Sequence, residues 1–506
     1  MSVHETTRLT RRMAMVLVLA AFAGPAVAQD PVPATLTLEQ AIDLAGRNNP
    51  TFRATANDEI ASDWQVREAF GQFIPSLSVN SGFDYQASGT PNFGSFSAAD
   101  VGISRTPSYF FSDYGLGISM QLSGATFFQV AQAKANGRAT EARIDAAAYT
   151  LAIDVTRQYV VTLRARDNVE LQRSVLESAE ESLNLAQGRF EAGDATRIDV
   201  AQAEVTTGRA EVGLLQAESA LETEKVRLLQ QIGIDVDRPI ELTSEFEVFE
   251  PQWELATLMD DALRAHPQLA SLRASESAAS AGSRAAKMSY LPRLSLNGNL
   301  ASGRIRRTND LDYLIAQGRS SAANQIENCQ FLNQISAGLS TPLPDRPEDC
   351  STLAFSAADE AAIRSSNDGF PFGYNSNPMF LSLTVSLPIL DGFTRERQVQ
   401  EARVAADDAR HDRRAGELAR RAEVTAAYNE LMTAYRTVAL QERNAAAAEE
   451  QLFLARERYR LGAGSIVELA QAQETKALAD QERLDSVYSF HENLAALEAA
   501  VGRPLR

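Results

Sequence analysis

The sequence predicts an α+β fold in which one unit, two strands followed by a long helical hairpin, occurs twice along the chain. Three observations predict this fold. A turn motif recurs in two distant segments, four stretches alternate between apolar and polar residues, and two very long segments contain no proline. The recurrence indicates an internal two-fold repeat, the alternation indicates strands, and the proline-free segments of helix-forming residues indicate long helices.

The internal repeat is visible as two aligned pairs of segments. AQGRFEAGDATRIDVAQAE at residues 186–204 aligns without a gap with ARERYRLGAGSIVELAQAQ at residues 455–473, an offset of 269. Upstream, residues 49–82 align with residues 266–299 at an offset of 217. The second copy has therefore gained 52 residues, the difference between the two offsets, and this insertion lies between Ala301 and Asn377.

Each copy is expected to begin with one helix, at residues 38–71 and 253–288, and to continue into a strand, a polar loop and a returning strand. The strands are inferred from period-two alternation, which gives a strand one apolar and one polar face. The alternating apolar positions are Leu77, Val79, Phe83 and Tyr85; Leu116, Ile118, Met120 and Leu122; Leu294, Leu296 and Leu300; and Leu381, Leu383, Val385, Leu387 and Ile389.

A very long helix is expected after each returning strand. In the first copy it covers residues 125–190, ~100 Å at 1.5 Å per residue, and a shorter helix returns through residues 196–231. Gly193 in the first copy, and Gly462 with Gly464 in the second, mark the turns, because glycine adopts the left-handed conformation that ends a helix. The narrow, alanine-rich apolar stripes favour a coiled-coil-like helical layer.

The N-terminus has the pattern of a secretory signal peptide. Three arginines precede the apolar run MAMVLVLAAFA, which is too short to span a membrane, and Ala26-Val27-Ala28 is a small-x-small cleavage site. We expect residues 1–28 to be removed, so that the mature chain begins at Gln29. No cysteine follows the site, so no lipid anchor is expected. An uncleaved N-terminal anchor is the alternative.

The charge of the chain bears on its partners. The formal net charge is -18, and removal of the first 28 residues, which carry +2, leaves -20. This acidic balance argues against nucleic acid as a partner, because phosphate binding needs a basic face. No second apolar run has the length of a helical membrane span. A role in a membrane would therefore depend on the strands.

The residues that could carry chemistry are few. Cys329 and Cys350 are the only cysteines, and in an exported chain they favour a disulfide, with two buried free thiols as the alternative. The histidines beyond the signal, His266, His411 and His491, lack the spacing of zinc ligands, and no glycine-rich phosphate loop is present. We therefore expect no enzyme, no cofactor, no metal site and no energy source in this chain.

Four strands of about ten residues match the length of transmembrane β-strands. A sheet in lipid must close, and four strands are too few, so several chains would have to share one sheet. Two chains would give about eight strands with a filled interior, and three would give about twelve around an aqueous lumen. A soluble four-stranded sheet packed on helices is the alternative, which alternation alone does not exclude.

The order, spacing and duplication of these elements resemble the TolC family of outer membrane efflux proteins. The similar segments are FIPSLSV and YLPRLSL before the outgoing strands, VSLPILDGF from Val385, and the two turn motifs from Arg189 and Arg458. The resemblance covers about Leu36 to Pro504. It implies a homotrimer, with a shared 12-stranded transmembrane β-barrel to which each chain gives four strands, and a long α-helical periplasmic barrel.

The resemblance also implies a domain organisation. Residues 1–28 are the signal peptide, 29–245 the first TolC-like repeat, and 246–506 the second repeat. The enlarged loop at 301–377 would be extracellular, where a Cys329–Cys350 disulfide would stiffen it.

The function implied is a passive export duct in the bacterial outer membrane that extends into the periplasm. It would serve a tripartite efflux or type I secretion system and carry small molecules such as drugs, or a secreted protein. Its partners would be a periplasmic adaptor (membrane fusion) protein, an inner-membrane RND pump or ABC exporter, and outer membrane lipid. The alternative is a soluble periplasmic coiled-coil scaffold or adaptor.

In the family, a gated periplasmic aperture lies at the tips of the helical hairpins. The matching positions here are two acids, a locking tyrosine and a glutamine in place of a second acid: Glu468, Asp199, Tyr459 and Gln471. Without the resemblance, Glu468 would be interpreted as a solvated residue in the first turn of a helix, favoured by the helix dipole.

The family's bracing arginine is replaced by Gly464, and Arg197 or Arg460 could supply that charge. The turns would also dock the adaptor, because small residues let another helical hairpin approach closely. A solvated turn without a partner is the alternative. The expected docking residues are Phe190, Gly193, Leu461, Gly462 and Gly464.

Overall fold

The computed structural model describes residues 35–90, 92–93, 96–97, 105–235, 240–244, 246–341, 343–344 and 347–505, so the expected signal peptide lies outside the described residues. The chain divides into two compact units. The sheet unit consists of Trp64–Ala133 and Ser280–Val404. The helical unit consists of the residues before Trp64, Lys134–Ala279 and Ala405–Arg506.

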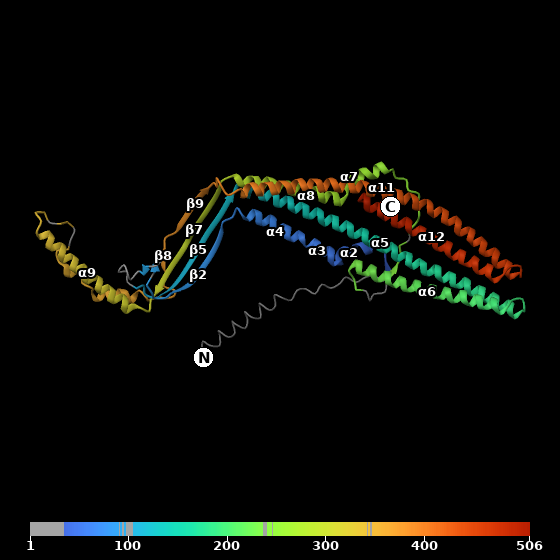
Figure 1. Cartoon of the computed structure of the whole chain (residues 1–506), viewed down its shortest axis with the longest axis horizontal. Helices are drawn as coiled ribbons and strands as arrows, with labels where there is room; N and C mark the ends of the chain where they lie inside the picture. Colours follow the sequence, from blue (N-terminus) through green and yellow to red (C-terminus); the bar gives the residue numbers. More distant parts are fainter. Residues whose placement is uncertain are drawn as a thin grey trace, which may run out of the picture. The chain divides into compact units, whose positions relative to one another are not determined.

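The sheet unit contains an antiparallel sheet whose strands lie side by side (Figure 1). Its order is β2-β5-β7, and two further strands pair with the other edge of β7. The strands are β2 Ser76–Gln86, β5 Tyr109–Ser123, β7 Arg293–Arg307, β8 Asn375–Asn377 and β9 Phe380–Ser386. Two short strands, β3 Asn92–Phe93 and β4 Phe96–Ser97, pair separately with each other.

The register gathers the apolar residues on one face. Met120, Leu296 and Leu383 form one row across β5, β7 and β9. In this single chain their face is open: Val79 is 80% exposed and Leu383 65%. We call this the apolar face of the sheet. Leu77, Val79, Leu116, Ile118, Leu294, Leu296, Leu383 and Val385 lie on it, and Ser78, Asn80, Asn297, Ser382 and Thr384 lie on the opposite face.

Two strands differ in length from the expectation. The last strand, β9, ends at Ser386 rather than continuing to Ile389, and Pro388, which has no N–H to donate, cannot extend a ladder there. Strand β7 is longer and reaches Arg307. It accommodates one extra residue at Leu300, where the pairing with β5 shifts between Leu116 and Gly117.

The insertion between the strands of the second copy was expected to be a polar loop, but it also contains helices. They are α9 Leu311–Ala337, the 3-10 turn η3 Cys350–Leu353, and α10 Ala357–Ser365. The carboxylate of Asp310, at the start of α9, accepts a hydrogen bond from the backbone N–H of Ser108 at 2.6 Å. This contact ties the base of α9 to the segment that leads into β5.

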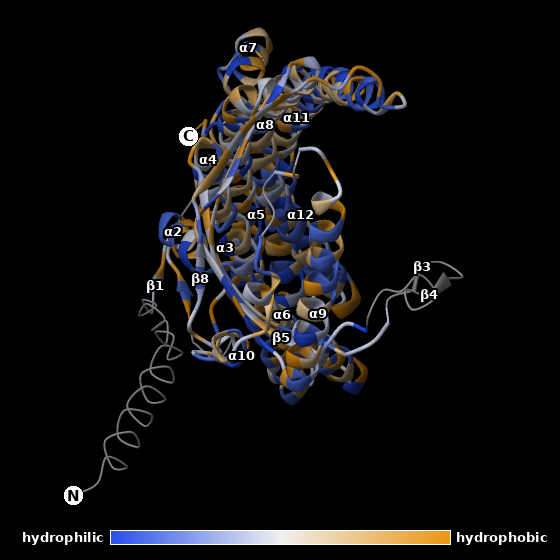
Figure 2. Cartoon of the chain, turned by 90° about the vertical axis from the view of Figure 1, so that its left-hand side faces the viewer, coloured by the Kyte–Doolittle hydropathy of each residue, from blue (hydrophilic) through white to orange (hydrophobic). Residues whose placement is uncertain are grey.

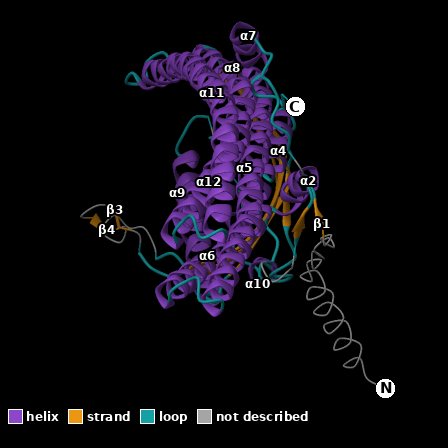
Figure 3. Ribbon diagram, turned by 90° about the vertical axis from the view of Figure 1, so that its right-hand side faces the viewer, coloured by secondary structure: helices purple, strands orange, loops and turns teal. Residues whose placement is uncertain are grey.

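Two helical hairpins account for most of the chain, and Figure 3 shows their helices in purple. The members are α5 Gly124–Glu191 with α6 Arg197–Ile232, and α11 Thr394–Arg460 with α12 Ile466–Val501. The first helix of each pair has 68 or 67 residues and the second has 36, which confirms the predicted long helix with a shorter return. The two hairpins meet where α6 packs against α12.

The single helix predicted at the start of each copy was wrong, because each segment is broken. The first splits into α2 Leu38–Asn48, α3 Pro50–Ala56 and α4 Asp58–Gly71, and the second into α7 Leu255–Ala265 and α8 Pro267–Lys287, followed by the 3-10 turn η2 Met288–Tyr290. Proline disfavours the helical conformation of the preceding residue. Asn49 and His266 are accordingly extended, with ψ of 118° and 126°.

The helical unit contains two apolar clusters, one built mainly from each repeat. The first contains Leu36, Tyr159, Leu163, Leu228, Leu229 and Ile232, and the second contains Leu258, Val424, Leu431, Phe490, Leu494 and Val501. A short parallel pair, β1 Thr35–Leu36 and β6 Glu241–Leu242, borders the first cluster. Elsewhere along the hairpins orange and blue residues are mixed (Figure 2), which fits narrow, alanine-rich contacts.

A glycine ends the returning helix of each hairpin against the broken helix of the same repeat. Gly233 follows α6 with φ 85°, and a Cβ there would lie 2.6 Å from the carbonyl oxygen of Asn48. Gly502 follows α12 with φ 92°, and a Cβ there would lie 2.9 Å from the Cα of His266. The backbones therefore touch at equivalent places in both repeats, and we call these two contacts the glycine joints.

His266 in the second glycine joint is held in its neutral form. Its Nδ1 accepts a hydrogen bond from the backbone N–H of Gln268 at 3.0 Å, so its Nε2 must donate to the carbonyl of Ala499, also at 3.0 Å. Burial lowers the pKa of His266 from its ordinary 6.5, although the bond to Ala499 opposes this. Among the charged groups nearby, Arg420 lowers the pKa further and Glu423 raises it. Protonation of Nδ1 would break the bond to Gln268.

We therefore expect the second glycine joint to weaken in acid. The folded pKa of His266 lies below the unfolded value, so its neutral form stabilises the fold fully above about pH 6.5, and this stability is lost as the pH falls below that value. Amide exchange in α7 and α8 should accelerate between pH 7.5 and 5, after correction for intrinsic rates. His266→Gln should flatten this dependence, whereas His411→Gln, at an exposed position on α11, should preserve it. An equal response in both variants would contradict the assignment.

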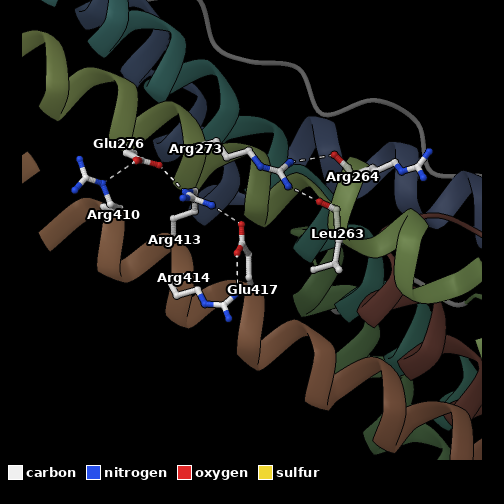
Figure 4. Close-up of polar contacts among 8 residues, drawn as sticks. All are labelled: Leu263, Arg264, Arg273, Glu276, Arg410, Arg413, Arg414 and Glu417. Atoms are coloured by element: carbon white, nitrogen blue, oxygen red, sulfur yellow. Dashed lines mark hydrogen bonds and ion pairs between the residues drawn. The ribbon is translucent and has the colours of Figure 1, made fainter. Parts of the chain in front are cut away.

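Ion pairs join α8 to α11 next to that joint (Figure 4). The guanidinium of Arg413 lies 2.6 Å from Glu276 on α8 and 2.6 Å from Glu417 on its own helix. Arg273 on α8 donates to the backbone carbonyls of Leu263 and Arg264, which are left unpaired where α7 ends. These contacts fix α8 on both sides, so the arginine-rich start of α11 serves in part to hold the broken helix.

Candidate functional site at the hairpin tips

The two turns at the hairpin tips have the same local design. Gly193 and Gly462 adopt φ of 82° and 75°, the left-handed region that glycine enters without strain. The next helices are capped by the residues that precede them, Thr196 and Ser465, whose side chains accept from the backbone N–H groups of Asp199 and Glu468. Both acids thus occupy the third position of a helix, where the dipole favours negative charge.

The two carboxylates are used differently. Asp199 completes a capping box, in which its Oδ2 accepts from the backbone N–H of Thr196 at 2.7 Å and from the threonine hydroxyl at 3.0 Å. Glu468 makes no such return bond, and its carboxylate lies 3.6 Å from Arg458, with half of its side chain exposed. Glu468 is therefore the acid whose charge is available to its surroundings.

A small apolar cluster holds the tips of the two hairpins together. Leu469 and Tyr459 are almost completely buried in it, at 0% and 2% exposure. The other members include Ala186, Ala203, Leu452, Ile466 and Ala472. The cluster draws from α5, α6, α11 and α12, so the tip residues of both repeats share one packed core.

Tyr459 is an unusual member of this cluster, because its hydroxyl is buried and finds no hydrogen-bond partner among the residues described. Burial raises the pKa of Tyr459, the charge of Asp199 raises it further, and Arg189 lowers it. The guanidinium of Arg189 lies over the ring, 4.6 Å from the centroid. Tyr459 is thus held by its ring face and by packing.

Arg189 is the tip residue that sequence analysis did not single out. It donates to the backbone carbonyl of Tyr459 in the other hairpin, and to that of Asp194 in its own turn at 3.0 Å. Its alignment with Arg458 in the repeat was the one available signal, but a repeat marks an equivalent position and does not reveal which neighbour the side chain reaches.

The expected docking residues lie at the tips with unequal exposure. Leu461 is 71% exposed and Phe190 41%. Gly464 is partly covered, and a Cβ there would lie 3.2 Å from the Cβ of Arg458. Gln471 is exposed and borders a hollow of about 840 Å³ between the two hairpins, which is also lined by Ser178, Arg456, Gln473 and Lys476.

The two cysteines belong to the sheet unit and not to the tips. A disulfide joins Cys329 on α9 to Cys350 in η3, and so links the long helix of the insertion to the segment that follows it. Among the described residues, no group of three or more potential metal ligands is found. In the same part of the chain, no helix combines the length and hydrophobicity needed to cross a membrane.

Known proteins resemble this chain in sequence and in fold. The family model for outer membrane efflux proteins matches residues 41–234 and 352–503. The pyoverdine export outer membrane protein OpmQ of Pseudomonas aeruginosa is 31% identical over 158 residues, which span 30% of this chain and 32% of OpmQ. Protein CyaE of Bordetella pertussis is 24% identical over 498 residues, 95% of this chain and 88% of CyaE.

Solved structures share the fold. The CmeC outer membrane channel of Campylobacter jejuni superimposes with a TM-score of 0.67 at 16% identity, covering 92% of this chain and 85% of CmeC. The predicted fold class, a TolC-like α+β protein with an internal two-fold repeat, is confirmed.

The matches support an efflux channel of the outer membrane that extends into the periplasm, and they give no support to the alternative of a soluble periplasmic scaffold. Because the family model matches more than half of the residues, this chain belongs to the outer membrane efflux protein family.

Proposed function

We propose that the chain is the passive outer membrane duct of a tripartite export system and works as a homotrimer. A periplasmic adaptor would dock at the hairpin tips, and an inner-membrane RND pump or ABC exporter would supply the energy. The observation that carries the proposal is the apolar face of the sheet, together with its two outer edges. In the described residues no strand pairs with the outer edge of β2 or of β9.

The chemistry of the sheet favours closure by other copies of the chain. Unpaired N–H and C=O groups cost several kcal/mol each in lipid, so the outer edges of β2 and β9 need strands from neighbours. Three chains with four long strands each would form a barrel of about twelve strands, wide enough for an aqueous lumen. The apolar face would then contact outer membrane lipid, and the face with Asn80 and Thr384 would line the lumen.

Two measurements test the duct. Native mass spectrometry of the protein extracted from outer membranes should give three times the mass of the mature chain, and a dimer or monomer would overturn the trimer. In a strain that lacks its own export channel, expression of the chain should lower the accumulation of a pumped dye. Failure to lower it, with trimers present, would exclude drug-type efflux.

Cargo can be assigned by the partner that docks at the turns. A photo-crosslinker at Ala463 should trap the adaptor, which mass spectrometry can identify. The adaptor of a proton-driven pump would indicate small-molecule efflux, and the adaptor of an ATP-driven exporter would indicate protein secretion. Small molecules are the favoured cargo, because OpmQ is by name a pyoverdine export protein. The absence of any trapped periplasmic protein would count against docking at Leu461, Gly462 and Gly464.

The acids at the tips would set the ion preference of the periplasmic aperture. Three copies of Glu468 around a narrow passage would concentrate cations, with Asp199 and Gln471 beside them. Glu468→Lys should therefore lower the cation preference measured as a reversal potential in planar bilayers, since it places a second cation beside Arg458. Glu450→Lys, the same charge change at an exposed position further along α11, is the control. Equal selectivity in both variants would remove Glu468 from the aperture.

A further inference from the structure

We propose that Arg189 is the brace of the closed tip, the residue that holds the turn of the second hairpin against the first and thereby limits the opening of the duct. The inference deepens the proposed function and rests on it, because the tips can limit a passage only if the chain forms a duct. It is carried by the three contacts of one guanidinium: the ring of Tyr459, the backbone carbonyl of Tyr459, and the backbone carbonyl of Asp194.

Comparison of the two repeats makes the role specific. Arg458 occupies the equivalent position in the second hairpin, and it bonds within its own hairpin, to the carbonyl of Ala463 at 3.3 Å and to Glu468 at 3.6 Å. Arg189 likewise bonds to its own turn, at Asp194, but its other N–H groups reach the opposite hairpin. Arg458 therefore caps only its own turn, whereas Arg189 caps its own turn and also joins the two hairpins.

The other candidates for the brace do not reach across. Arg460 lies 2.7 Å from Glu457 on its own helix. Arg197 is exposed at the start of α6, and the described residues include no ion-pair partner for it. Gly464 has no side chain. Of these positions and Arg189, only Arg189 contacts both tips.

The brace uses the ring face and the backbone of Tyr459, and not its hydroxyl. The hydroxyl has no partner in the described structure, and the carboxylate of Asp199 is engaged with Thr196. A planar guanidinium can lie flat on a ring and donate hydrogen bonds in its own plane at the same time, whereas an ammonium group offers no flat face to the ring. Separation of the tips would therefore break a cation–π contact and a charge-assisted hydrogen bond together.

The test measures single-channel conductance of the full trimer in planar bilayers. Arg189→Ala should raise the fraction of time spent in high-conductance states by about tenfold, which corresponds to roughly 1.4 kcal/mol. Arg189→Lys should recover part of the closure, because it keeps the positive charge and can still donate a hydrogen bond to one carbonyl. Tyr459→Phe should leave the open fraction close to that of the unmodified channel, because the ring and the backbone carbonyl that Arg189 contacts both remain. Arg197→Ala, which removes a neighbouring charge from the same turn, is the control and should match the unmodified channel.

A second measurement separates the brace from the duct. Spin labels on cysteines introduced at Ala192 and Ala463 report the distance between the two turns of one chain when labelled chains are assembled with an excess of unlabelled chains, and the native cysteines are already bonded to each other. Arg189→Ala should lengthen and broaden this distance, and Arg197→Ala should not. Equal distances in the two variants would overturn the brace. A brace seen by spin labels in a protein that forms no channel would overturn the proposed function instead.

Discussion

Replacement of Gly233 by alanine is expected to destabilise the chain by about 3 kcal/mol or more, a large effect for the addition of one methyl group. Two costs add at this position. The left-handed φ of 85° is strained for any residue with a Cβ, and the new Cβ would lie 2.6 Å from the carbonyl oxygen of Asn48. The opposing atoms belong to the backbone, so no rotation of a side chain can relieve the overlap.

The same hairpin contains two matched controls for Gly233. Gly193 has a left-handed φ, but a Cβ added there would meet no atom within 4 Å, so Gly193→Ala should cost only the strain, about 1 kcal/mol. Gly208 lies inside α6 with neither feature, and Gly208→Ala should be neutral or stabilising by up to about 1 kcal/mol. Urea unfolding of the protein in detergent, followed by far-UV circular dichroism, measures the series. Equal midpoints for Gly233→Ala and Gly208→Ala would contradict the close contact at the first glycine joint.

Gly502→Ala extends this prediction to the second repeat. Its φ is 92°, and the new Cβ would meet the Cα of His266 at 2.9 Å. We expect a destabilisation comparable to that of Gly233→Ala, because the two glycine joints are equivalent. If one substitution lowered the stability strongly and the other did not, the two repeats would differ in the energy of this contact.

Leu383→Lys is expected to prevent most of the protein from assembling in the outer membrane, whereas Thr384→Lys should be tolerated. The two residues are neighbours on β9, and both are exposed in the single chain. Leu383 lies in the row with Leu296 on the apolar face, and Thr384 lies opposite Ser295 on the other face. A lysine that faces lipid costs about 2–4 kcal/mol near the bilayer midplane, and one that faces a water-filled lumen costs little.

Outer membrane fractionation and heat-resistant migration in gels measure the assembly of both variants. Each replaces a neutral residue with the same cation on the same strand, so general effects of charge on export and folding are matched. Equal assembly of the two variants would contradict the assignment of the apolar face to lipid. If only Thr384→Lys failed to assemble, the face with Thr384 would be the one that contacts lipid.

The sequence by itself determined the repeat, the strands and the long hairpins, because each depends on local spacing. The alternation of apolar and polar residues around Leu77 and Val79 predicts a strand without any knowledge of tertiary contacts. The glycines at 193 and 462 predict turns, because few other residues enter the left-handed region without strain. The breaks at Pro50 and Pro267 have the same local origin, because a proline disfavours the helical conformation of the residue before it.

The tertiary structure alone decided which side chains meet across the two hairpins. Arg189 and Arg458 are equivalent by sequence, yet Arg189 reaches Tyr459 while Arg458 remains within its own hairpin. By sequence, Gly233 is an ordinary glycine at a helix end, and only the structure shows that the backbone of Asn48 lies against it. Contacts between residues separated by some 185 to 270 positions depend on how the helices pack, and local periodicity carries no information about that packing. For this reason the family and the fold could be predicted from the sequence, whereas the brace at the tips and the glycine joints could not.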